Sequence, residues 1–336
     1  MRAAQWALRG GFLVTSTAFV SRRMARMVRV FVWLMSCAML SAGAQPVVPM
    51  TARQVSPSVW YVEGVSALGS TANQNFISIA AFVVTPAGVV VIDALGSPVL
   101  AERLLAEIRK VTPKPVTHVI VTHYHADHIY GLQTLRQQGA RVIAHRSAGE
   151  YLNSDTARLR LEHSRREIAP WVNAKTVLVP PDQWLDGDLT LEVGSTRFLI
   201  RHVGPAHTPE DLVVYVPSEM VLFAGDLVFR NRIPYVGQAD SRRWIEALEH
   251  LLAFDATTIV PGHGPLSRDA RKDMELTRDY LVYLRAKMAQ AAHNLEPFED
   301  AYRATDWSRF EGLPLFQVAN RMNAYNTYLL MEHQSP

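Results

Sequence analysis

The segment Thr122-His123-Tyr124-His125-Ala126-Asp127-His128 decides the interpretation of this chain. It directly follows the apolar, β-branched stretch 118–121, which is typical of a buried strand. In a loop at the end of a strand, alternate side chains can point into one pocket, so His123 and His125 can bind one metal ion. Asp127 and His128 can then reach a second ion nearby. Because neutral imidazole and carboxylate groups suit zinc, the spacing predicts a metal site rather than core packing.

Three further residues of ligand type also follow predicted strands. Each has Gly or Pro close by, which lets the backbone turn sharply at a metal. They are His207 in Gly204-Pro205-Ala206-His207-Thr208-Pro209, Asp226 after Val221-Leu222-Phe223-Ala224-Gly225, and His263 in Gly262-His263-Gly264. One of them alone would indicate an ordinary loop residue, but together with the histidine loop they complete a site for two ions.

In this order along the chain, the motifs THYHADH, GPAHTPED, FAGD and PGHG resemble the metallo-β-lactamase superfamily over nearly all of residues 58–265. The resemblance implies an α/β fold, an αββα sandwich of two mixed sheets flanked by helices, with the metals at one edge. It assigns His123, His125 and His207 to one zinc, assigns Asp127, His128 and His263 to the other, and makes Asp226 the bridge between them. It also marks Asp93 as a residue that holds the histidine loop, although an Asp in a turn after a strand looks the same.

Differences between this ligand set and those of some relatives indicate which branch of the superfamily the chain resembles. Many β-lactamases of this fold bind the second zinc through Cys or lack the bridging carboxylate, whereas Asp226 gives this chain a ligand set similar to that of glyoxalase II. Oxygen-reducing di-iron relatives have Glu in place of His125, which disfavours that role but leaves a mononuclear iron dioxygenase open. The segment 226–244 resembles exported hydrolases associated with quinoprotein relay or sulfur-oxidation systems. Within it, we expect Arg232 to be a solvated loop arginine near the pocket mouth, with binding of an anionic substrate as the alternative.

The ligand set predicts a hydrolase in which a metal-bound hydroxide attacks a small ester, thioester, lactone or amide-like substrate. Asp127 is the expected catalytic residue, which orients the nucleophile or carries its proton. The expected cofactors are two Zn²⁺ ions, with iron or manganese as alternatives. A metallo-β-lactamase is the alternative among hydrolases. An iron-dependent sulfur redox enzyme and a non-catalytic periplasmic relay protein are the alternatives from other classes.

The N-terminus, residues 1–44, has the pattern of a signal peptide. Its basic stretch 22–29 leads into an apolar run, 30–40, which is too short to span a bilayer as a helix, and Ser41-Ala42-Gly43-Ala44 provides a cleavage site. We therefore expect a periplasmic or secreted protein with no stable membrane insertion after cleavage. The only cysteine, Cys37, lies in this segment, so every metal ligand of the mature chain must be His, Asp or Glu.

The rest of the chain reads as one domain, 58–336, which ends in helices and follows a lead-in segment, 45–57. Six of the 34 Lys and Arg residues lie in 1–44, where no acidic residue occurs, so the remainder has 28 basic and 31 acidic residues. This balance argues against nucleic acid as a partner and leaves a small-molecule substrate, with the oligomeric state undetermined. We further expect a helical cap over 147–168 and a strand over 176–179.

Overall fold

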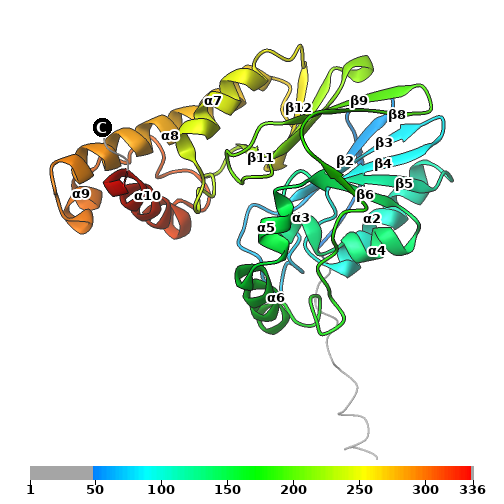
Figure 1. The fold of residues 1–336 in the computed structure, drawn as a ribbon, viewed down its shortest axis with the longest axis horizontal. Helices are drawn as coiled ribbons and strands as arrows, with labels where there is room; N and C mark the ends of the chain where they lie inside the picture. The colour runs from blue at the N-terminus through cyan, green and yellow to red at the C-terminus, as the bar shows by residue number, and fades with distance from the viewer. Residues whose placement is uncertain (1–47, 334–336) are drawn as a thin grey trace, which may run out of the picture. The chain divides into compact units, whose positions relative to one another are not determined.

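Two mixed β-sheets form the centre of the structure, a computed structural model that describes residues 48–333 (Figure 1). The first sheet has the order β1-β2-β3-β4-β5-β6-β7, with antiparallel pairing from β1 to β4 and parallel pairing from β4 to β7. Its strands are β1 (Arg53–Gln54), β2 (Val59–Glu63), β3 (Ile79–Thr85), β4 (Gly88–Ile92), β5 (Val116–Ile120), β6 (Arg141–His145) and β7 (Gln183–Leu185). The predicted signal peptide and residues 45–47 of the lead-in lie outside the described residues, whereas β1 lies within the lead-in and forms the edge of this sheet.

The second sheet has the order β12-β11-β10-β9-β8. Only β11 and β12 pair in parallel, and the other neighbours are antiparallel. Its strands are β8 (Leu189–Val193), β9 (Thr196–His202), β10 (Leu212–Val216), β11 (Val221–Phe229) and β12 (Thr258–His263). Both sheets are therefore mixed, as predicted.

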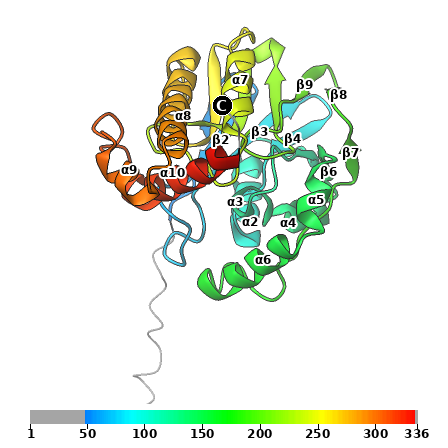
Figure 2. The same ribbon diagram turned by 60° about the vertical axis from the view of Figure 1, so that its left-hand side comes forward.

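Helices cover the outer face of each sheet (Figures 1 and 2). In β4, Val89 and Val91 pack with α2 residues such as Leu104, while Val90 and Ile92 face the second sheet, because side chains alternate along a strand. A third core lies between the second sheet and helices α7, α8 and α10. The helices are α2 (Pro98–Val111), α3 (Ala126–Ile129), α4 (Leu132–Gln137), α5 (Ala148–Leu152), α6 (Asp155–Glu167), the 3-10 turn η1 (Pro217–Glu219), α7 (Ser241–Leu251), α8 (Ala270–His293), α9 (Phe298–Ala304) and α10 (Phe316–His333). Three apolar layers separate four layers of structure, and the predicted αββα fold is confirmed.

Two local expectations need correction. The strand predicted at 176–179 is absent, and pairing with β6 begins only at Gln183, after Pro180 and Pro181. Proline has no N–H group to donate to a neighbouring strand, which explains the delayed start. The predicted cap is two helices rather than one, since Ser154 ends the turn after α5 and caps α6 through a hydrogen bond from Ala157 N.

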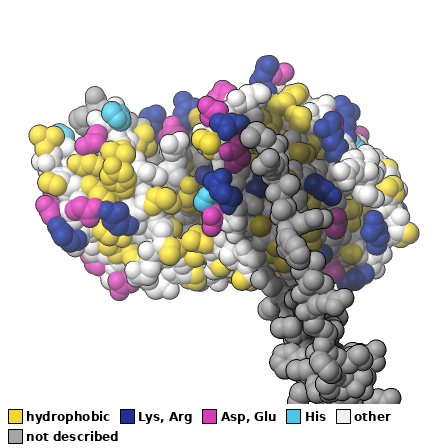
Figure 3. All heavy atoms as spheres, turned by 90° about the horizontal axis from the view of Figure 1, so that it is seen from below, with side chains coloured by type: hydrophobic (Ala, Val, Ile, Leu, Met, Phe, Trp, Pro, Cys, Tyr) yellow, Lys and Arg dark blue, Asp and Glu magenta, His cyan; other side chains and the backbone are white. Residues whose placement is uncertain are grey.

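The C-terminal helices leave apolar side chains at the surface. Four residues of α10 at helical spacing are at least 37% exposed: Val318, Met322, Tyr325 and Leu329. Figure 3 shows hydrophobic side chains gathered at the left of the view, where Figure 1 places α9 and α10. Among the described residues, none of the helices combines the length and apolar character needed to cross a bilayer.

Candidate metal centre

The seven predicted ligands come from segments in or just after strands at one edge of the two sheets, and Asp226, expected after a strand, lies within β11. His123 and His125 lie in the loop after β5, and α3 begins at Ala126, so Asp127 and His128 occupy its first turn. The other three come from the second sheet: His207 from the β9–β10 loop, Asp226 from within β11, and His263 from the end of β12. The structure brings all seven together in two groups, and within each group the potential ligand atoms lie within 4.8 Å of one another.

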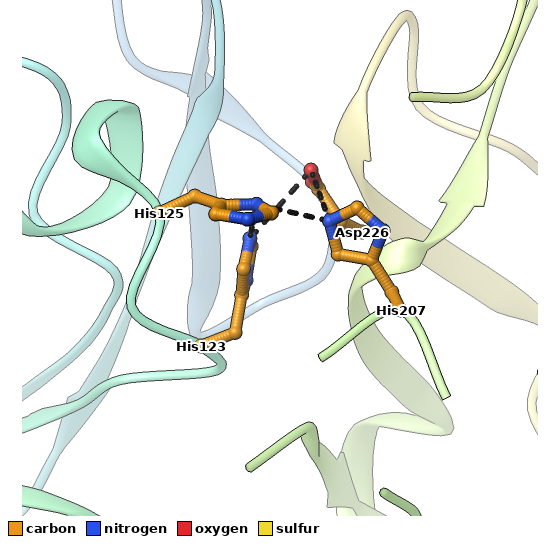
Figure 4. A group of neighbouring side chains, drawn as sticks. All are labelled: His123, His125, His207 and Asp226. Carbon is orange, nitrogen blue, oxygen red and sulfur yellow. Dashed lines mark hydrogen bonds and ion pairs between the residues drawn. The ribbon is translucent and has the colours of Figure 1, made fainter. Parts of the chain in front are cut away.

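The first group contains His123, His125, His207 and Asp226 (Figure 4). His125 Nδ1 lies 3.1 Å from His123 Nε2 and 3.0 Å from His207 Nε2. Oδ2 of Asp226 lies 3.6 Å from His123 Nε2 and 3.4 Å from His207 Nε2. Three imidazole nitrogens and one carboxylate oxygen thus converge on a single point between them.

The second group contains Asp127, His128 and His263, and Asp226 adjoins it as well. His263 Nε2 lies 3.2 Å from Asp127 Oδ2 and 3.3 Å from Asp226 Oδ2. The other oxygen of Asp226, Oδ1, lies 3.2 Å from His128 Nε2. Asp226 therefore lies between the two groups.

The hydrogen bonds on the outer side of the rings determine which nitrogens face the site. His128 Nδ1 donates to Asp93 Oδ2 at 2.9 Å, and His263 Nδ1 donates to the carbonyl oxygen of Ile77 at 2.7 Å. Each Nε2 is therefore left with a lone pair when the ring is neutral. Because these lone pairs face carboxylate oxygens of Asp226 and Asp127, a proton or a metal ion must lie between the acceptors. His128 Nε2 and Asp226 Oδ1 are both buried without a hydrogen-bond partner among the described residues, so the donor set fits a divalent cation.

In the first group, burial and mutual charge favour the protonation states that a cation needs. Burial, reinforced by His207, lowers the pKa of His125 to about 3, and burial also lowers the pKa of His123 well below its ordinary value. Both rings are therefore neutral and keep a lone pair. Although burial opposes ionisation, His263 and His128 hold the pKa of Asp226 well below its ordinary value. Burial also opposes protonation of His128, yet Asp226 and Asp127 raise its pKa well above the ordinary value, which shows how strongly this point attracts positive charge.

Asp93 holds the histidine loop in place. Besides accepting from His128, its carboxylate accepts hydrogen bonds of 2.8 Å from Thr122 N and from Thr122 Oγ1. Thr122 Oγ1 in turn lies 3.0 Å from His123 Nδ1, which orients the first group as well. One buried carboxylate thus fixes a ring in each group, and its position agrees with the role that the family resemblance implied.

Other supports could not be predicted from the sequence. Glu210 accepts a hydrogen bond of 3.0 Å from Tyr124 N, and Asp211 accepts two from Thr208, so both carboxylates brace loops that carry ligands. A side chain at Gly262 would overlap the Asp226 carboxylate, so only glycine leaves room for it. The only indication of these residues in the sequence is that they lie within the GPAHTPED and PGHG motifs, which does not indicate their roles.

Arg232 is buried, which contradicts the prediction for this residue. The sequence predicts a solvated loop arginine, but the residue is only 6% exposed. Its guanidinium lies 3.2 Å from His263 Nδ1 and 5.5 Å from the centre of the Phe229 ring. It lies behind His263 and does not line the cavity beside the metal centre.

The comparisons with known proteins agree with this geometry. The family model of the metallo-beta-lactamase superfamily matches residues 75–263, more than half of the chain. A linear primary-alkylsulfatase from Pseudomonas sp. (strain ATCC 19151) is 27% identical over 236 residues, which cover 59% of this chain and 44% of that protein. A metallo-beta-lactamase type 2 from Bacillus sp. (strain 170) is 30% identical over 185 residues, which cover 54% of this chain and 64% of that protein. The chain thus matches less than two thirds of the length of either relative.

Solved structures share the fold. A metallo-beta-lactamase from Pontibacter korlensis has a TM-score of 0.55 and 25% identity, covering 70% of this chain and 99% of that one. A sec-alkylsulfatase from Pseudomonas sp. has a TM-score of 0.67 and 15% identity, covering 84% of this chain and 50% of that one, and it supports the fold alone. Fold and clustered ligand-type side chains agree with one family. The chain belongs to the metallo-beta-lactamase superfamily.

Proposed function

We propose that this protein is an exported hydrolase whose seven clustered side chains hold two zinc ions and which cleaves a small ester, thioester, lactone or amide-like bond. The observation that carries the proposal is the set of lone pairs, fixed by outer hydrogen bonds, that converge with the carboxylates of Asp127 and Asp226. Five imidazoles and two carboxylates suit zinc, and a thiol is not needed. When bound, two divalent cations supply Lewis acidity and lower the pKa of a water molecule toward neutrality. Export and a periplasmic or secreted location are supported by the pattern of residues 1–44.

The protein's own groups divide the remaining work. Asp226 lies between the two groups and is 4% exposed, whereas the Asp127 side chain is 16% exposed. Asp127 is therefore the carboxylate that a reacting water can reach, and we assign to it the orientation of the nucleophile and the handling of its proton. His125 and His207 line the adjacent cavity, so a substrate held there contacts the first group directly.

A sulfate ester is the second candidate substrate. Its support is the similarity to the linear primary-alkylsulfatase, over more than half of this chain. A β-lactam remains a third, supported by the similarity to the Bacillus metallo-beta-lactamase. The sulfate ester and the β-lactam are tested together with the other substrates, because each is cleaved by attack of water at a centre that a cation can polarise.

The test is a panel of initial rates with the zinc-loaded protein. The panel contains a chromogenic cephalosporin, a thioester, a lactone, an aryl ester, a sulfate ester and a phosphodiester. We expect the wild type to hydrolyse one class of substrate. The rate should fall by about two orders of magnitude or more in His125→Ala. The rate should be unchanged in His250→Ala, which changes an exposed histidine of α7. Equal rates in wild type and His125→Ala would contradict the proposed site. Silence across the panel, with iron in the protein and oxygen consumption, would favour the redox alternative.

A further inference from the structure

A cavity of ≈ 450 Å³ lies beside the metal centre, and its lining extends from His125 and His207 to parts of the chain that sequence motifs did not single out. Helices α5 and α6 contribute Tyr151 and Arg160, and the segment after β11 contributes Tyr235. The cavity is where a substrate must lie if its scissile bond is to reach the first group. The other groups in its lining therefore determine which substrates fit.

Arg160 is the only Lys or Arg side chain in this lining. Among the described residues, none of the ion pairs involves it, whereas Arg158 on the same helix pairs with Asp155 and Glu162. Glu210 also lines the cavity, but its carboxylate accepts from Tyr124 N instead. Arg160 thus presents a guanidinium to the cavity without a carboxylate partner, and this cation is permanent because arginine does not lose its proton in proteins.

Two tyrosine hydroxyls lie near this guanidinium, on a residue that is otherwise exposed. The Tyr235 hydroxyl lies against it, and the Tyr151 hydroxyl is nearby. The Tyr151 hydroxyl oxygen is buried and has no hydrogen-bond partner among the described residues. Burial raises the pKa of Tyr151 to about 12, so its hydroxyl keeps its proton and can donate. A planar guanidinium with two phenols beside it is a donor set for an oxyanion, and the fork of arginine matches a carboxylate in particular.

We infer that the cavity selects substrates that carry a carboxylate in addition to the hydrolysed bond, and that Arg160, Tyr151 and Tyr235 bind this carboxylate. The inference rests on the proposed function, because it places the scissile bond at the metal centre and the carboxylate at Arg160, in the lining of the same cavity. Arg160 comes from α6, the second cap helix, so this helix contributes specificity in addition to covering the site. The residue is a specificity determinant, and it takes no part in bond cleavage.

The test uses two esters that differ by one carboxylate group, phenyl acetate and 4-acetoxybenzoate, and compares each variant with the wild type. The measured quantity is the ratio of kcat/KM for the charged ester to that for the neutral one, which cancels any loss common to both. We expect this ratio to fall at least about tenfold in Arg160→Gln, mainly through KM of the charged ester, and to fall less in Arg160→Lys. Arg158→Gln, which alters an exposed and ion-paired arginine of the same helix, should keep the wild-type ratio. An unchanged ratio in Arg160→Gln would overturn the inference.

A binding measurement separates this inference from the proposed function. Calorimetric titration with 4-hydroxybenzoate, the product of the charged ester, needs no turnover. If the wild type binds it, Arg160→Gln does not, and neither ester is hydrolysed, the carboxylate site stands and ester hydrolysis is wrong. If both esters are hydrolysed while the ratio and the binding are the same in wild type and Arg160→Gln, hydrolysis stands and the carboxylate site is wrong.

Discussion

Replacing Asp93 with Asn tests the reasoning on lone pairs most sharply, because the change removes a charge and keeps the shape. The Asp93 carboxylate accepts three hydrogen bonds of 2.8–2.9 Å, two from Thr122 and one from His128 Nδ1. An Asn side chain has one acceptor oxygen. If that oxygen accepts from Thr122 N, the amide NH₂ group faces the N–H of His128, and two donors meet. The His128 ring then relieves this contact by moving its proton to Nε2.

That proton would lie on the atom that faces Asp226 Oδ1 at 3.2 Å, where the second cation needs a lone pair. Loss of an outer hydrogen-bond partner of this kind costs about 10–100-fold in metal affinity, or about 1.4–2.8 kcal/mol. We expect the second zinc equivalent to weaken by this amount and the first to change less. Because the mismatched donors are buried, the free energy of unfolding should also fall by about 1–3 kcal/mol.

The assay is competition for zinc with a chromophoric chelator, with circular dichroism to verify folding. Asp182→Asn is the matched control, since Asp182 accepts from Val142 N at 2.9 Å and from Arg136 Nη2 at 2.6 Å, away from the metal centre. It should bind both equivalents as the wild type does. A folded Asp93→Asn protein with wild-type affinity for both equivalents would refute the assignment of Asp93 and of the His128 tautomer.

Two further predictions concern space and pH. Gly262→Ala would place a methyl group against the Asp226 carboxylate, so zinc affinity should fall by about tenfold or more, whereas Gly312→Ala, which meets no atom within 4 Å, should leave it unchanged. Burial and the stacked ring of His202, at 3.6 Å, lower the pKa of His145 from 6.5 to about 4. The unfolded chain therefore takes up a proton there below about pH 6.5 while the folded chain does not until about pH 4, so stability should fall as the pH is lowered through this range. His145→Asn should flatten that fall in urea unfolding at pH 7 and pH 5, and equal pH dependence in both proteins would count against this origin.

The sequence is informative where chemistry is concentrated in short motifs at strand ends. Strands β9, β11 and β12 run in the same direction, so residues at or near their carboxyl ends lie at one edge of the sheet. The motifs and the family resemblance that they carry therefore group His207, Asp226 and His263 with the histidine loop. The two mixed sheets follow from the family resemblance that the same motifs carry. In each case the information is local, because a ligand, a turn residue and a buried strand lie within a few positions of one another.

What the sequence does not reveal depends on packing between distant segments. Arg160, Tyr151 and Tyr235 come from three elements, and nothing in their local sequence indicates that they line one cavity. Arg232 is expected in solvent because it lies in a loop, yet the Phe229 ring and His263 bury it. The prediction of a strand at 176–179 rests on the β-branched residues there and is wrong. Pro180 and Pro181 lack the N–H groups that pairing needs, so pairing with β6 begins only after them.

Zinc stoichiometry tests the central claim of a two-metal site most directly. The purified protein is saturated with zinc, freed of excess metal, and measured by native mass spectrometry together with elemental analysis. We expect two zinc ions per chain in the wild type and about one in His263→Ala, which leaves His123, His125, His207 and Asp226 in place. A wild-type protein that binds no zinc, or a His263→Ala protein that still binds two, would contradict this claim.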